Sequence, residues 1–117
     1  MTIYTEIILD HFENPRNRGF IVNSTKSCHV SNPLCGDKIN MAIKVDKEKV
    51  ADIKFEGAGC AISTAAASML TEYVKGRKVA DLKKLNQKSM IKLLGIELGV
   101  NRIKCALLPL EALHKLI

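Results

Sequence analysis

The sequence predicts an α+β fold, in which a three-stranded antiparallel sheet is covered on one face by an N-terminal helix and C-terminal helices. Two observations carry this prediction. Apolar and polar residues alternate in two neighbouring segments near the middle of the chain, and apolar residues recur at helical spacing at both ends. A helix, then strands, then helices, without repeated strand–helix units, is typical of α+β proteins. The 117 residues suffice for one modest core, so a single domain over 1–117 is expected.

The chain is predicted to begin with an amphipathic helix over residues 2–12. Its apolar side chains share one side of the helix: Ile3, Ile7, Ile8 and Phe12. The segment "NPRNRG" follows, and its proline and glycine end the helix.

Two strands are predicted to pair as an antiparallel hairpin, at 38–45 ("KINMAIKV") and 51–57 ("ADIKFEG"). In the second, one set of side chains alternates with charged residues: Ala51, Ile53 and Phe55. The segment "DKEK" joins the strands as a tight turn. One face of the hairpin is rich in lysine and is expected to meet water, so helices must cover the other. An edge strand is expected within 20–30 ("FIVNSTKSCHV").

Helical periodicity returns after the second hairpin strand. Four helices are predicted: 61–76, 78–85, 87–99 and 102–117. Gly76 ends the first of them, which places Cys60 at its N-terminal end. Pro109 is tolerated in the last helix if Cys105 lies at the start of that helix, and would otherwise kink it.

The composition, with 47% hydrophobic and 26% charged residues, is ordinary for a globular soluble protein. No apolar stretch approaches the roughly 20 residues that span a bilayer, so no membrane association is expected. The opening segment carries acids within its apolar run and does not resemble a secretory signal. These features predict a cytoplasmic protein.

The formal net charge of +6 is confined to the last third of the chain, because residues 76–117 contain nine basic and three acidic residues. Three Phe, two Tyr and no Trp offer few aromatic rings for stacking on bases, which argues against nucleic-acid binding. A solvated lysine-rich surface or an acidic protein partner accounts for the excess.

The four cysteines do not form a CxxC pair, and in a reducing compartment they favour metal or redox chemistry over disulfides. Cys35 lies on a turn in "NPLCGDKI", with Asp37 two residues later. Cys60 and Cys105 are expected near helix N-termini, which stabilise thiolates, and Lys104 favours the same charge state in Cys105. Taken singly, each cysteine could equally serve in a turn or in packing.

Three thiolates and one carboxylate suit two kinds of site. One is tetrahedral zinc, and the other is a [2Fe–2S] cluster with one non-cysteine ligand. A carboxylate in place of a fourth thiolate weakens the hold on a cluster, which suits a carrier that must release it. Cys28 is interpreted as a packing residue, and His11 and His114 as residues at the surface or core edge.

The motifs resemble those of the iron–sulfur cluster scaffold family of the IscU, SufU and NifU N-terminal type, over essentially the whole chain. "DHFENPRNRG", "NPLCGDKI", "FEGAGCAIS" and "RIKCALLPLEAL" match its segments in order. The resemblance implies that Cys35, Asp37, Cys60 and Cys105 converge and hold a [2Fe–2S] cluster. It also implies a cysteine desulfurase as sulfur donor and apo iron–sulfur proteins as acceptors, with a homodimer left open. The protein would then be an assembly scaffold rather than a turnover enzyme.

Two departures keep an alternative open. The IscU branch has histidine at the position of Lys104, whereas the SufU branch has lysine there. Lys104 therefore favours a zinc-dependent sulfurtransferase, in which Cys105 accepts the sulfur and Lys104 activates its thiolate. The chain has no room for the SufU-type insertion between the second and third cysteines, which argues against it. "LGVNR" replaces the chaperone-recognition stretch of the IscU branch, so a dedicated Hsp70-type partner is not expected.

Overall fold

The computed structural model describes residues 3–32, 36–57, 59–96 and 98–117. Its elements follow the predicted order of helix, strands and helices, which confirms the α+β class. They are α1 (Ile3–Glu13), β1 (Lys26–Asn32), β2 (Asp37–Asp46), β3 (Lys49–Glu56), α2 (Ala61–Val74), α3 (Val79–Leu82), α4 (Gln87–Leu94) and α5 (Val100–Leu116).

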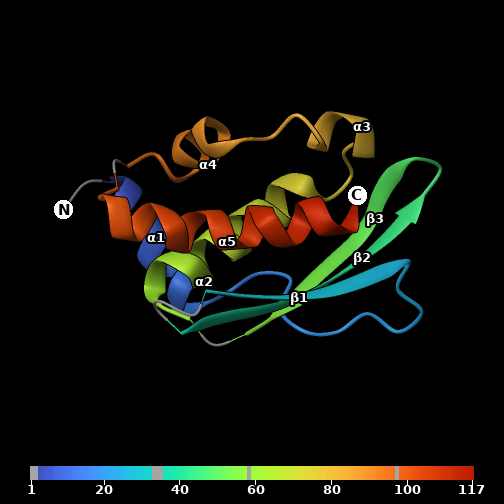
Figure 1. Ribbon diagram of the computed structural model, residues 1–117, viewed down its shortest axis with the longest axis horizontal. Coiled ribbons are helices and arrows are strands. Elements are labelled where there is room, and N and C mark those ends of the chain that lie inside the picture. The colour runs from blue at the N-terminus through green and yellow to red at the C-terminus, as the bar shows by residue number, and fades with distance from the viewer. Residues whose placement is uncertain (1–2, 33–35, 58, 97) are drawn as a thin grey trace.

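The strands form one antiparallel sheet in the order β1-β2-β3. Helices α2 and α5 cover one face of this sheet, and α1 packs chiefly against α2 (Figure 1). Helix α4 packs on α2 and α5 from the side opposite the sheet, so the helices form two layers there. Within the described residues, no helix is long and apolar enough to cross a membrane.

The alternation predicted for the hairpin is present in β2, where Ile39, Met41 and Ile43 are buried and Val45 is half-buried, while the lysines are exposed. In β3 the prediction fails at Ala51, which is exposed, whereas Val50 is buried. The register explains the difference: Lys44 pairs with Asp52 but Val45 pairs with Val50, which leaves Ala51 as the extra residue of a β-bulge. A bulge reverses the side on which the following residues point.

The predicted tight turn connects β2 to β3 through two residues, Lys47 and Glu48. Both have positive φ, of 51° and 67°, as a type I′ hairpin turn requires. The tip is tied to the segment after α2, because Val79 donates its N–H to the Glu48 carbonyl at 2.9 Å. The sheet is thus anchored to the helices at its end as well as through its face.

Helix α5 begins earlier than predicted. Gly99 is its N-cap and Val100 its first residue, so Cys105 lies in the second turn rather than at the helix start. The prediction for Cys105 was wrong because no helix-breaking residue separates Gly99 from Cys105. Pro109 is inside the helix and fully buried.

Candidate metal centre

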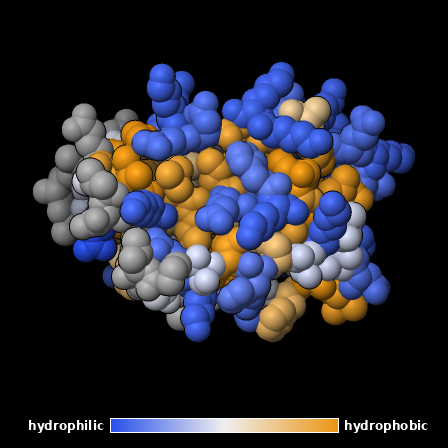
Figure 2. Space-filling model, viewed as in Figure 1, coloured by the Kyte–Doolittle hydropathy of each residue, from blue (hydrophilic) through white to orange (hydrophobic). Residues whose placement is uncertain are grey.

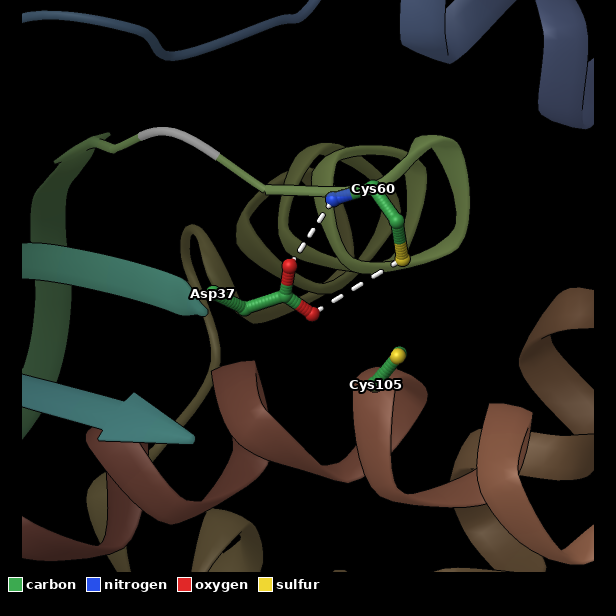
Figure 3. A group of neighbouring side chains, drawn as sticks. All are labelled: Asp37, Cys60 and Cys105. Atoms are coloured by element: carbon green, nitrogen blue, oxygen red, sulfur yellow. Dashed lines mark hydrogen bonds between the residues drawn. The ribbon is translucent and has the colours of Figure 1, made fainter. Parts of the chain in front are cut away.

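Three side chains from distant parts of the sequence converge at one end of the sheet. Asp37 is the first residue of β2, Cys60 precedes α2, and Cys105 lies in α5 (Figure 3). One carboxylate oxygen and the two sulfur atoms all lie within 4.8 Å of one another. The structure therefore brings together three of the four residues that the sequence singled out; Cys35 lies outside the described residues.

Asp37 is buried, with 2% of its surface exposed. Its Oδ1 accepts a hydrogen bond from the Cys60 backbone N–H at 2.9 Å, and its Oδ2 lies 3.7 Å from the Cys60 sulfur (Figure 3). A buried carboxylate is costly unless hydrogen bonds or positive charge compensate it. The N–H of Cys60 supplies part of that compensation and fixes Asp37 against the start of α2.

Cys60 is the N-cap of α2, which confirms its predicted position at the helix N-terminus. Its backbone is extended, and its sulfur accepts a hydrogen bond from the Ser63 N–H at 3.5 Å. Oxygen-bearing side chains are the usual N-caps, and sulfur is a weaker acceptor while it carries a proton. The Ser63 N–H in the first turn of α2 therefore points at a sulfur atom that becomes a stronger hydrogen-bond acceptor when it loses its proton.

Two glycines allow the loop between β3 and α2 to approach β2. A Cβ at Gly57 would lie 2.0 Å from the Lys38 carbonyl oxygen, and one at Gly59 would lie 2.2 Å from Ser63 Oγ and 3.2 Å from Asp37 Oδ1. No functional role was predicted from the sequence for either glycine or for Ser63. The sequence does contain a signal for this role. Two glycines separated by one residue stand directly before Cys60, and glycine often marks a place where two backbone segments approach closely.

Cys105 is also buried, with 4% of its surface exposed, whereas the neighbouring Lys104 side chain is exposed. Consecutive residues of a helix point about 100° apart, so adjacency in sequence does not bring the Lys104 amine to the cysteine. The role assigned to Lys104 in activating the thiolate stays a prediction.

The donor set fits a soft or borderline metal. Two sulfur ligands favour zinc or an iron–sulfur cluster, and one carboxylate oxygen is compatible with either. Among the described residues, neither cysteine takes part in a disulfide, so both sulfur atoms can serve as ligands after loss of a proton.

Cys28 lies away from this group, on β1 opposite Met41 of β2. Its thiol donates a hydrogen bond to the Ala112 carbonyl of α5 at 3.3 Å. Burial raises the pKa of the Cys28 thiol, and the nearby charge of Lys115 offsets only part of that effect. This environment favours the protonated thiol and agrees with the packing role expected for Cys28.

The "DHFENPRN" segment fastens α1 to α2. His11 is more buried than expected, with 7% exposed, and its Nδ1 lies 2.7 Å from Ser68 Oγ, while His114 is exposed as predicted. Ser68 Oγ also accepts the Arg16 backbone N–H at 2.9 Å. Burial lowers the pKa of His11, so the ring is neutral near pH 7 and serves as a packing and hydrogen-bonding group.

The chain matches the family model of the NifU-like N terminal domain over residues 3–117. Among curated relatives, it is 40% identical to the iron–sulfur cluster assembly scaffold protein IscU of Aquifex aeolicus over 113 aligned positions. These cover 95% of this chain and 71% of the relative. It is 37% identical to the zinc-dependent sulfurtransferase SufU of Bacillus subtilis over 131 positions, which cover 97% of this chain and 88% of the relative.

Solved structures show the same fold. One, described as an iron–sulfur cluster assembly scaffold for the SUF system (FiSufU) of Fervidobacterium islandicum AW-1, is 28% identical, with a TM-score of 0.80 and coverage of 94% and 93%. The N-terminal part of a NifU-like protein from Brucella abortus, at 21% identity, shares the fold with a TM-score of 0.76 and coverage of 97% and 90%. This chain belongs to the NifU-like N-terminal domain family.

Proposed function

We propose that this protein is a scaffold on which a [2Fe–2S] cluster is assembled from iron and desulfurase-derived sulfur and then transferred to apo-proteins. The observation that supports this function best is the group formed by Asp37, Cys60 and Cys105, in which two thiols and one carboxylate lie within 4.8 Å of one another. The relatives named as IscU scaffolds support it independently.

The cluster is the cargo of this site, and four side chains are proposed to hold it. Cys60 and Cys105 supply two thiolates, and Cys35 supplies a third from its position two residues before Asp37. Asp37 supplies the fourth ligand. Since iron–sulfur clusters are ordinarily held by four thiolates, a carboxylate in one position weakens the hold and eases release to an acceptor.

A cysteine desulfurase is the proposed source of sulfur. A thiolate of the scaffold, which we assign to Cys105, attacks the outer sulfur of the donor persulfide. The S–S bond of the donor breaks, its cysteine leaves as a thiolate, and a new persulfide forms on Cys105. The transferred sulfur still needs two electrons from an external reductant before it enters a cluster as sulfide. The positive charge of Lys104 is proposed to attract the anionic donor group.

A zinc-dependent sulfurtransferase is the second candidate, favoured by Lys104 directly before Cys105 and by the similarity to SufU. The alignments argue for the scaffold. The SufU alignment has 131 positions although this chain has 117 residues, so at least 14 positions belong to the relative alone. The IscU alignment of 113 positions is hardly longer than the part of this chain that it covers. Within the aligned region, this chain thus lacks the extra positions of SufU but has a SufU-like residue beside Cys105.

Anaerobic purification with metal and sulfide analysis and a visible spectrum tests this function. The scaffold predicts iron with acid-labile sulfide in equal amounts, and transfer of both to an apo-ferredoxin. Stoichiometric zinc without sulfide, retained after incubation with iron, desulfurase and cysteine, would instead establish the sulfurtransferase.

A further inference from the structure

A groove of about 520 Å³ lies between α2 and α4, on the side of the helices away from the sheet. Its wall is mainly apolar and is formed by Leu70, Tyr73, Leu85, Met90 and Leu93 together with the polar Ser89 and Lys92. Leu85 and Leu93 are half-buried, and the Tyr73 side chain is 37% exposed. On the face shown in Figure 2, hydrophobic residues are exposed between hydrophilic side chains in the region that α4 and α5 occupy in Figure 1. The helices therefore leave apolar surface in contact with water.

The rim of this groove carries basic side chains: Lys92 is part of its lining, Lys88 lies one helical turn before it on α4, and Arg77 lies over the Tyr73 ring. Residues 72–92 contain seven Lys and Arg and only two acids, Glu72 and Asp81. All seven basic side chains are exposed. Among the described residues, only Lys75 of these seven forms an ion pair, with Asp52. The guanidinium of Arg77 lies 3.8 Å over the Tyr73 ring, which holds a positive charge at the groove edge.

The groove lies well away from the candidate metal centre. Cys60 stands at one end of α2, and the groove residues Leu70 and Tyr73 lie about 15 and 20 Å further along the helix, at a rise of about 1.5 Å per residue. A partner seated in the groove would therefore leave the mouth of the metal centre free for cargo to enter and leave.

We propose that this groove docks an acidic, amphipathic helical segment of a protein partner. Apolar side chains spaced at i, i+3, i+4 and i+7 on such a segment would enter the groove, and its carboxylates would meet the lysines of the rim. Charge complementarity identifies the occupant: the basic residues of the rim, Arg77, Lys88 and Lys92, are exposed, form no ion pair among the described residues and adjoin an apolar floor. Nucleic acid fits less well, because Tyr73 is the only aromatic residue of the described lining.

The test uses a synthetic peptide of defined sequence and the full-length protein. The probe is a fluorescein-labelled amphipathic peptide with leucines at helical spacing and glutamates elsewhere, and its control is a scrambled peptide of the same composition. Fluorescence anisotropy is measured at low and high salt, and a single-stranded oligonucleotide of similar charge serves as competitor. Because this binding needs neither metal nor sulfide, its outcome is independent of the proposed cluster assembly.

Two double variants locate the binding site. Lys88→Glu/Lys92→Glu reverses two charges on α4, and Lys26→Glu/Lys44→Glu makes the same change in net charge on exposed residues of the sheet. We expect the first pair to weaken peptide binding by about 10-fold and the second by less than about 2-fold, because only the first pair faces the ligand. Tyr73→Ala is expected to weaken binding several-fold, with the circular dichroism spectrum unchanged.

Equal affinity for the two peptides, or an equal loss of peptide affinity in the two double variants, would show that binding depends only on net charge and would overturn the proposal. Tighter binding of the oligonucleotide, lost with Lys88→Glu/Lys92→Glu, would overturn it as well and assign the basic rim to nucleic acid.

Discussion

Cys60 and Cys28 are both half-buried cysteines, but the groups around their sulfur atoms differ. The Cys60 thiol accepts an N–H from Ser63 and donates to the Asp37 carboxylate at 3.7 Å, where a metal ion can take the place of the thiol proton. The Cys28 sulfur donates its proton to the Ala112 carbonyl. A thiol that donates to a carboxylate can lose its proton when both groups bind a metal ion, whereas a thiol that donates to a backbone carbonyl inside the fold keeps its proton. The acceptor of the thiol proton, a carboxylate for Cys60 and a backbone carbonyl for Cys28, therefore separates the two cysteines where exposure does not.

The largest expected effect comes from removing the proposed ligands. Cys35→Ser, Cys60→Ser and Cys105→Ser are each predicted to abolish a normal [2Fe–2S] cluster, because each removes one of only three thiolates. Cys28→Ser is predicted to leave it intact. Visible absorbance and acid-labile sulfide after anaerobic reconstitution measure the cluster content of each variant. Loss of the cluster in Cys28→Ser alone would contradict the distinction between Cys28 and the proposed ligands.

A large effect on stability is expected at Gly57. In Gly57→Ala the new Cβ would meet the Lys38 carbonyl oxygen at 2.0 Å, and backbone atoms must shift to accommodate it. We expect a loss of about 2–4 kcal/mol in the free energy of unfolding, together with a displaced Cys60. Gly99→Ala is the matched control, since its Cβ meets no atom within 4 Å. Urea unfolding curves compare them, and similar losses in both would contradict the close approach.

Asp37→Ala is expected to retain the cluster longer, so that the rate of cluster transfer to an apo-ferredoxin falls several-fold. The reason is that the substitution removes a hard, weakly binding donor. It should also destabilise the fold by about 1–2 kcal/mol, since the Cys60 N–H loses an acceptor. Asp37→Asn keeps a side-chain oxygen for that N–H and separates the two effects. An unchanged transfer rate in Asp37→Ala would exclude Asp37 from cluster release.

A smaller, several-fold effect is predicted for Lys104→Met, which removes an exposed charge at similar side-chain length. Sulfur uptake from the desulfurase should slow while the metal centre still forms, because the charge acts on the incoming donor rather than as a ligand. The rate of ³⁵S transfer from labelled cysteine measures it. Lys115→Met, on the same helix, is the control, and equal rates in the two variants would remove the role of Lys104.

The smallest effect concerns the thiol of Cys28. Since burial raises its pKa, the reactive thiolate forms at higher pH than in an unstructured peptide. With the other three cysteines replaced by Ser, alkylation by iodoacetamide at pH 8 should be a few-fold slower than that of a model peptide, and the difference should shrink as the pH rises. A faster reaction than that of the peptide would show that the Ala112 carbonyl does not hold the proton.

The sequence was sufficient for the element order because alternation and helical spacing are local properties. It misplaced Ala51 because a bulge depends on how two strands pair, and it misplaced Cys105 because nothing local marked where α5 begins. The proximity of Asp37, Cys60 and Cys105 was implied by family resemblance rather than by spacing. The roles of Gly57 and Gly59 escaped notice because close approaches between β2 and the β3–α2 loop exist only in the folded chain.

Because Cys60 is the N-cap of α2, the stability of the first turn of this helix should depend on whether the metal centre is occupied. In the proposed scaffold, a bound cluster would replace the thiol proton of Cys60 and leave a metal-bound thiolate, which is a stronger acceptor for the Ser63 N–H. Cargo binding would therefore tighten the first turn of α2, and release would loosen it. The hydrogen-exchange rate of the Ser63 amide should therefore be lower in the filled form than in the empty form. It would report the occupancy of the site without any optical signal from the cluster.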